Sequence, residues 1–297
     1  MASCAMTRRS CAAAEIMTIY PDFYDVFRCA ASGCRHTCCR GWEIDIDAET
    51  AARYRVLPGE LGERLRASIT ETESGATFCL TEDERCPFLR ADGLCDLIRT
   101  TGSEDILCDV CALHPRFFAE VGDVTLAGLG LCCEEACRLL LAEKKPLLFC
   151  AEDRAVPLAA LAGCAFSGDM LRFWPRTDEA SCMALLERYA RTEPIDEAWT
   201  AQLAALRADA DACVRAAEAY RAEYDSAVFD RILHYILYRQ LDRLETDGPL
   251  ALARYAQDAA QFVFLTAAVT GDLPEALRRW SEQIEYSTEN VDILIAG

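Results

Sequence analysis

The crowding of cysteines in the first half of the chain constrains its fold more than any other feature. Twelve of the 18 cysteines lie between Cys29 and Cys137, and the tightest spacing is Cys29, Cys34 and the adjacent pair Cys38 and Cys39. Short irregular loops let several thiolates point at one centre, and both zinc and iron–sulfur clusters take thiolate ligands. The spacing therefore predicts a metal site in this half, without choosing between zinc and iron–sulfur.

Cysteine also packs in cores as a small apolar residue, and this alternative applies to part of the set. It is the simplest interpretation of Cys79, Cys108, Cys132 and Cys137, and of the widely spaced Cys150, Cys164, Cys182 and Cys213. Disulfides are a second alternative, which a reducing compartment disfavours.

The amino-terminal residues do not have the pattern of a secretory signal. Residues 1–16 contain a short alanine-rich run that Glu15 interrupts, whereas a signal peptide needs a longer apolar stretch. We expect this segment to be disordered or an over-called start, with Met17 as the initiator. The chain also lacks a run of about 18 apolar residues, so we expect a cytoplasmic protein with no membrane span.

Charge excludes one class of partner. The chain has 49 acidic and 30 basic residues, which gives a formal net charge of −19. A protein that binds nucleic acid needs a basic surface, so we expect no nucleic-acid partner. The acidic balance suits a basic protein partner instead. The sequence predicts no oligomeric state.

The character of the sequence changes near residue 145. Residues 17–145 are rich in cysteine and irregular in pattern, whereas residues 146–297 are rich in alanine and leucine with helical periodicity. The predicted fold is mainly α: an irregular cysteine-rich metal-binding region, then a helical bundle. Expected helices cover residues 48–54, 60–69, 178–191, 196–224, 229–244, 252–269 and 273–285, with a stop at Gly248-Pro249 and a cap at Asp272; expected strands cover 77–81 and 124–129.

Several short motifs resemble the flagellin lysine-N-methylases, and the cysteine-rich part is similar to a broader group of proteins named for zinc or iron chelation. The resemblance covers about residues 17–294. Glu134 stands where that family usually has proline. The motifs are Tyr20-Pro21-Asp22-Phe23-Tyr24, the cysteines from Cys29 to Cys39, Cys86-Pro87-Phe88-Leu89, Leu94-Cys95, Cys111 with His114-Pro115-Arg116, the segment 131–139, and the closing motif Trp280-Ser281-Glu282-Gln283-Ile284-Glu285-Tyr286.

The resemblance implies an enzyme that moves a methyl group from S-adenosylmethionine to lysine side chains of flagellin. It also implies an iron–sulfur cluster, [4Fe–4S] by preference, with zinc as the alternative metal. The ligands would come from eight cysteines, of which a four-iron cluster needs four. They are Cys29, Cys34, Cys38, Cys39, Cys86, Cys95, Cys111 and Cys133.

Catalytic residues are harder to assign from the sequence. A lysine amine must lose its proton before it attacks a methyl group, so a nearby base would help, and Glu285 and Tyr286 of the closing motif are the candidates. Arg116 is a candidate for binding the cosubstrate carboxylate. No glycine-rich turn follows a strong strand, so the cosubstrate site is not placed. The alternative is a non-catalytic iron–sulfur or zinc protein, a redox sensor or interaction module.

Overall fold

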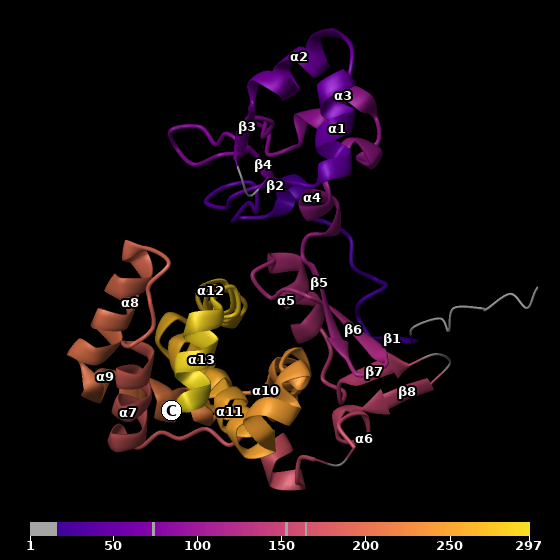
Figure 1. Cartoon of the computed structure of the whole chain (residues 1–297). Coiled ribbons are helices and arrows are strands. Elements are labelled where there is room, and N and C mark those ends of the chain that lie inside the picture. The colour runs from indigo at the N-terminus through magenta and orange to yellow at the C-terminus, as the bar shows by residue number, and fades with distance from the viewer. Residues whose placement is uncertain (1–16, 73–74, 152–153, 164) are drawn as a thin grey trace, which may run out of the picture.

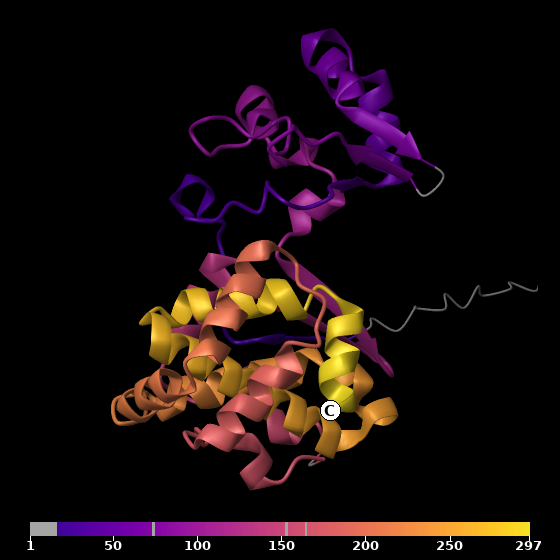
Figure 2. The same ribbon diagram turned by 90° about the vertical axis from the view of Figure 1, so that its left-hand side faces the viewer.

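The computed structural model describes residues 17–72, 75–151, 154–163 and 165–297. The predictions for residues 1–16 and for Cys164 fall outside this set. Helices predominate in the described part, as predicted, and two small sheets accompany them. Figures 1 and 2 show a smaller lobe standing on a larger one.

The small lobe, residues 39–113, is more regular than the sequence predicted. Its three-stranded antiparallel sheet has the order β2-β4-β3, and short helices surround it. Tyr54, Phe78 and Phe88 form the centre of its core, in which Cys86 and Cys108 are also buried. The elements are β2 (Asp45–Ile46), α1 (Ala48–Val56), α2 (Gly59–Ala67), β3 (Ile69–Thr72), β4 (Gly75–Phe78), α3 (Asp96–Thr101), a 3-10 turn η2 (Glu104–Ile106) and α4 (Asp109–Leu113).

A five-stranded sheet forms one side of the large lobe. Its order is β5-β6-β1-β7-β8, and β1 pairs in parallel with β6, while the other pairs are antiparallel. The hydroxyl of Tyr238 donates to the carbonyls of Ile19 and Ala127, which ties the helices to the middle of this sheet. The strands are β1 (Met17–Pro21), β5 (Arg116–Val121), β6 (Val124–Leu129), β7 (Leu148–Ala151) and β8 (Arg154–Pro157).

Helices complete the large lobe around the buried helix α11. Helices α9, α10 and α12 pack on it most extensively, and α5 packs on α12. The elements are η1 (Ala31–Gly33), α5 (Glu134–Leu141), α6 (Leu158–Leu161), η3 (Gly168–Leu171), α7 (Glu179–Tyr189), α8 (Glu197–Ala208), α9 (Ala210–Arg221), α10 (Ser226–Arg239), η4 (Leu241–Arg243), α11 (Leu244–Thr270), α12 (Leu273–Ile284) and α13 (Thr288–Ala296).

Most predicted elements are confirmed, because local signals mark their ends. The strand predicted at 124–129 is β6, and α12 begins after Asp272, whose carboxylate accepts from the Glu275 amide. The strand predicted at 77–81 is β4, which lies two residues earlier and ends at Phe78. Gly248 has non-helical backbone angles within α11, close to the predicted stop.

The prediction of one long helix over residues 196–224 is wrong, because two helices, α8 and α9, cover this stretch. The chain leaves the helical conformation at Asp209, which has φ −131° and ψ 77°. The Asp209 carboxylate then accepts a hydrogen bond from the Ala212 amide and so caps α9. Similarly, α10 ends at Arg239, before the predicted end at Leu244.

The two cores do not divide at residue 145. The core of the large lobe includes Ile19 and Leu126 from the first half of the chain as well as Phe262 from the second. The strands before residue 145 therefore pack with the helices after it. The predicted boundary between a cysteine-rich domain and a helical domain stays a prediction. No described helix is long and apolar enough to cross a membrane.

Candidate functional site

The predicted metal ligands fall into two groups of thiols. We call Cys29, Cys34, Cys38 and Cys133 the junction thiols, because they lie where the two lobes meet. Within this group Cys29 and Cys133 both lie near enough to Cys34 and Cys38 to contribute to the raised pKa of those two thiols. The small-lobe thiols are Cys39, Cys86, Cys95, Cys108 and Cys111, and the same kind of interaction joins Cys39 to Cys86, Cys95 and Cys111.

Two of the junction thiols lie at the ends of short helical elements, which fix their positions. Cys34 follows η1, and Cys133 is the residue that precedes α5. Burial, followed by the charges of Glu134 and Cys133, raises the pKa of Cys34 to about 11. Burial also raises the pKa of Cys133, while the amides of Ala136 and Glu135 at the start of α5 lower it. These two thiols, distant in sequence, are thus brought together by the turns that end in them.

Backbone contacts place the small-lobe thiols. The Cys86 amide donates to the Cys39 carbonyl at 2.8 Å, and Cys95 and Cys108 precede α3 and α4. A hydrogen bond from Cys111 lowers the pKa of Cys108. Cys108 is buried, as its interpretation as a small core residue predicts, but it also joins the thiol group. The spacing Cys108-x-x-Cys111 was the sequence signal for this role.

The adjacent cysteines Cys38 and Cys39 connect the two groups. Their thiols are hydrogen-bonded, and this bond raises the pKa of Cys38 and lowers that of Cys39 to about 6. A lowered pKa favours the thiolate, the form that binds metals and acts as a nucleophile.

The other cysteines do not all follow the core interpretation. Cys137, Cys182 and Cys213 are buried, as predicted. Cys79 is exposed, because it lies just after β4 at the edge of the small lobe and contacts Thr70 there. Cys132 and Cys150 are half-buried, so the core interpretation is wrong for Cys79 and only partly right for these two.

The thiols provide suitable donors, but their placement does not amount to a metal site. In the part of the chain that the structure describes, no three or more Cys, His, Asp or Glu side chains are grouped as metal binding requires. Thiolates are nevertheless the ligands that zinc and iron–sulfur clusters take. The donor chemistry therefore fits such a group, whereas the side-chain positions do not.

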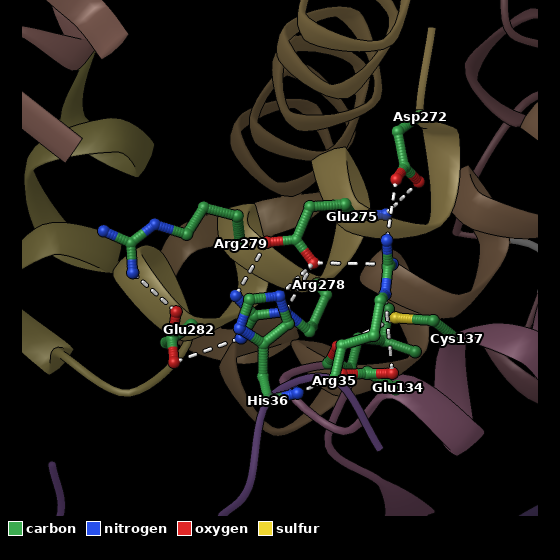
Figure 3. Close-up of polar contacts among 10 residues, drawn as sticks. Arg35, His36, Glu134, Cys137, Asp272, Glu275, Arg278, Arg279 and Glu282 are labelled. Atoms are coloured by element: carbon green, nitrogen blue, oxygen red, sulfur yellow. Dashed lines mark hydrogen bonds and ion pairs between the residues drawn. The ribbon is translucent and has the colours of Figure 1, made fainter. Parts of the chain in front are cut away.

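An ion-pair network binds the segment of the junction thiols to α5 and α12. Arg35 contacts Asp272 at 3.0 Å, Glu134 at 3.8 Å and Glu275 at 3.9 Å. The imidazole Nε2 of His36 lies 3.3 Å from Glu275, and the His36 amide donates to Glu134. Figure 3 shows Arg35 and His36 against the first turn of α12, with Glu134 beside them. His36 thus has a carboxylate partner here.

The closing motif lies against the same junction. Glu285 is wholly buried, pairs with Arg239 at 2.9 Å, and accepts a hydrogen bond from Ser281. The Cys132 thiol donates to the hydroxyl of Tyr286 at 3.1 Å, and the Tyr286 ring lies 5.2 Å from that of Trp42 in the small lobe. Burial raises the pKa of both Glu285 and Tyr286, so each favours its protonated form more than usual.

The structure places Arg116 among aromatic rings. Its guanidinium lies 5.6 Å from the Tyr24 ring and 5.3 Å from the Phe27 ring. Cation–π contacts of this kind hold an arginine in place. Arg116 does not line the cavity described next.

A cavity of about 460 Å³ opens beside the junction thiols. Three segments enclose it: residues 30–35, helix α5 with the residue after it, and Pro274 of α12. Its lining residues are Ala30, Gly33, Cys34, Arg35, Glu134, Glu135, Arg138, Leu141, Ala142 and Pro274. The fold and site thus define a mainly helical, two-lobed protein with thiols gathered near a charged cavity.

Comparisons with known proteins support the resemblance seen in the motifs. The chain is 27% identical to the Lysine-N-methylase of Salmonella typhimurium over 135 residues, which are 43% of this chain and 33% of that protein. The Lysine-N-methylase of Salmonella choleraesuis matches equally well. The flagellar biosynthetic protein FliU of Salmonella muenchen is 26% identical over 140 residues, 43% of this chain and 78% of that protein.

These matches are partial. The matched part spans about a third of the length of the Lysine-N-methylases. No protein-family model and no solved structure matches the chain. The chain therefore resembles the flagellin lysine-N-methylases, as its motifs predicted.

Proposed function

We propose that the protein is an S-adenosylmethionine-dependent lysine N-methyltransferase of the cytoplasm and that flagellin is its substrate. The observation that carries the proposal is the similarity to proteins named Lysine-N-methylase and FliU. The net charge of −19 is compatible with a lysine-bearing protein partner, because an acidic surface attracts a basic one.

The reaction makes one carbon–nitrogen bond and breaks one carbon–sulfur bond. The neutral lysine amine attacks the sulfonium methyl group, and S-adenosylhomocysteine leaves. The proton that the amine carried goes to a base or to water. An unperturbed lysine has a pKa near 10.4 and is mostly protonated at neutral pH, so its site must favour the neutral amine.

The closing motif offers groups for orienting the amine. Tyr286 is 45% exposed as a residue, and its hydroxyl accepts a hydrogen bond from the Cys132 thiol. Glu285 is enclosed and paired with Arg239, and in this proposal it holds Arg239 in place next to Tyr286. Glu285 lies at the end of α12, and Tyr286 contacts Cys132, the residue before the junction thiol Cys133.

An iron–sulfur cluster is the finer part of the proposal. Four of the junction and small-lobe thiols would supply its ligands, because thiolates are the donors that iron–sulfur clusters take. When bound, such a cluster supplies a redox centre or a rigid cross-link. Because the thiols do not converge in this structure, no step of the methyl transfer is assigned to it.

The test is direct transfer of label. Anaerobically purified protein is incubated with flagellin and S-adenosylmethionine labelled in the methyl group. The expected result is label on lysine ε-amines of flagellin, and none with boiled protein. If the protein binds its metal but leaves the lysines unlabelled, the alternative of a non-catalytic iron–sulfur or zinc protein replaces this proposal.

A further inference from the structure

The cavity beside Cys34 has an arrangement of charges that suits one class of ligand. Two carboxylates and two guanidiniums line a cavity of about 460 Å³, which lies within the usual size range of small-molecule sites. Arg138 binds Glu135 through two contacts of 2.7 Å, and Arg35 lies 3.8 Å from Glu134. Charges of both signs thus lie side by side in one small space.

The carboxylates lie deeper than the guanidiniums. The side chains of Glu134 and Glu135 are 19% and 15% exposed, whereas those of Arg35 and Arg138 are 57% and 62% exposed. A ligand with a cationic group would reach the carboxylates inside, and an anionic group on the same ligand would pair with the arginines at the rim. A free amino-acid group, with its ammonium next to its carboxylate, has this form.

The remaining walls are apolar or sulfur-bearing. Leu141, Ala142 and Pro274 supply aliphatic surface, and Cys34 places one of the junction thiols at the wall. Asp272 and Glu275 also pair with Arg35, so the ion-pair network beside the cavity adds two further carboxylates. A ligand with an apolar portion and a net positive charge is favoured here.

We infer that this cavity binds S-adenosylmethionine, with Glu134 and Glu135 at its cationic groups and Arg35 and Arg138 at its carboxylate. The cosubstrate carries an ammonium, a sulfonium and a carboxylate, which give it a net charge of +1. It lacks the phosphates of other adenine nucleotides, which the two carboxylates would repel. The inference rests on the proposed function and assigns the cosubstrate site that the sequence left open.

A substrate lysine fits the cavity less well. Its ammonium would pair with Glu134 or Glu135, but it offers nothing to Arg35 and Arg138. Arg116, the residue first considered for the cosubstrate carboxylate, stacks on Tyr24 and Phe27 outside this space.

Equilibrium dialysis with labelled S-adenosylmethionine tests the inference on the full chain. Ala142→Trp fills the cavity from an exposed position at the end of α5, and Glu135→Gln removes one charge at nearly constant shape. We expect Glu135→Gln to raise the Kd for S-adenosylmethionine by about tenfold, since loss of one charged contact is of this order. Ala142→Trp should raise this Kd by about tenfold or more, because the indole would occupy the space of the ligand. Circular dichroism and the thermal midpoint verify that both variants fold.

Arg207→Met is the matched control. Arg207 makes two contacts to Glu187, at 3.0 and 2.6 Å, on helices α7 and α8, and neither residue lines the cavity. Its Kd is expected to equal that of the wild type. Unchanged Kd in both cavity variants, with a wild type that binds, overturns the cavity assignment and leaves the methyltransferase proposal intact.

Two other outcomes also overturn the inference. If Ala142→Trp raises KM for flagellin but not for S-adenosylmethionine, the cavity takes the substrate lysine instead. If the wild type neither binds S-adenosylmethionine nor transfers its methyl group, the proposed function and the cavity assignment fall together.

Discussion

The small lobe and the large lobe build their cores from different materials. In the small lobe Cys86 and Cys108 are buried beside Tyr54 and Phe88, and three further cysteines, Cys39, Cys95 and Cys111, pack against this core. The large lobe has helices packed around α11, with aromatic stacks such as Tyr189 on Phe262, whose centroids are 4.0 Å apart. A unit as small as the first often needs a metal or a cross-link to be stable, whereas the second does not.

The two lobes supply different parts of the candidate site. The large lobe supplies a rigid frame that carries Cys133, the cavity and the closing motif. The small lobe supplies most of the other thiols and contacts that frame through Trp42 and Tyr286. The two lobes should therefore respond differently to changes in metal, packing, capping and pH.

The largest difference is expected in metal content, between a cysteine variant of the small lobe and one of the large lobe. Under the proposal that Cys86 is a metal ligand, Cys86→Ala should abolish most metal binding and unfold the small lobe, because a buried thiolate ligand would couple metal binding to folding. Cys182→Ala is the matched control, since Cys182 is equally buried but lies in α7. Iron, sulfide and zinc analysis of both variants measures the effect. Full metal content in Cys86→Ala would remove this residue from the ligand set, and a clear loss in Cys182→Ala would bring the bundle into it.

The next largest effect is expected for a substitution in the core of the large lobe, which should lower the free energy of unfolding. Trp280→Ala removes a wholly buried ring whose indole N–H donates to Tyr189 at 2.9 Å, so the free energy of unfolding should fall by about 3–5 kcal/mol. Trp174→Ala, which removes a ring that is 66% exposed, should change it by less than about 0.5 kcal/mol. Urea unfolding followed by circular dichroism gives both values. Similar losses in the two variants would show that the helices are not packed as described.

Capping residues allow a matched test of each lobe. Asp47 caps α1 by accepting from Thr50 and also accepts from Asp109 at the start of α4, while Asp178 caps α7. Replacing either by alanine should cost about 1 kcal/mol. Amide hydrogen exchange should show faster exchange in the small lobe alone for Asp47→Ala and in the large lobe alone for Asp178→Ala. Uniform acceleration across both lobes would contradict their independence.

The smallest effect is expected for the decrease in the free energy of unfolding at acidic pH. Burial holds the pKa of His234 in α10 below its usual value of 6.5. The unfolded chain therefore binds this proton more readily, so the free energy of unfolding should fall as the pH drops below about 6.5, and His234→Gln should reduce this fall. His114 has its pKa lowered by burial as well, so part of the fall should remain. Unfolding at pH 8 is the control, and equal slopes in the two proteins below pH 6.5 would show that His234 has no part in it.

Local chemistry explains which parts of the fold were predictable. Asp178 and Asp272 mark the starts of α7 and α12 in the sequence. Each carboxylate accepts a hydrogen bond from a backbone amide three residues further on, so the capping interaction is local. Asp209 is the same kind of signal inside an alanine-rich stretch, where the favourable helix propensity on both sides concealed it. Strand β1 was not predicted, since it pairs with Val124 and its neighbours, which are remote in sequence.

The site was predictable in its residue types and not in its grouping. All eight predicted ligands lie in the small lobe or at its junction, but the association of Cys34 with Cys133 depends on tertiary structure that spacing cannot encode. The role of Glu134 was hidden for the same reason. It ties residues 35 and 36 to α5 only when the two segments meet.

Methylation of flagellin in cells that make this protein tests whether the protein is a flagellin lysine methyltransferase. Flagellin is produced with and without the chain in a host that lacks lysine methylation of its own, and its lysines are examined by mass spectrometry. Methyl groups are expected on lysine side chains only when the chain is present. Flagellin that is identical in the two cultures, although the protein is folded and abundant, would contradict this expectation.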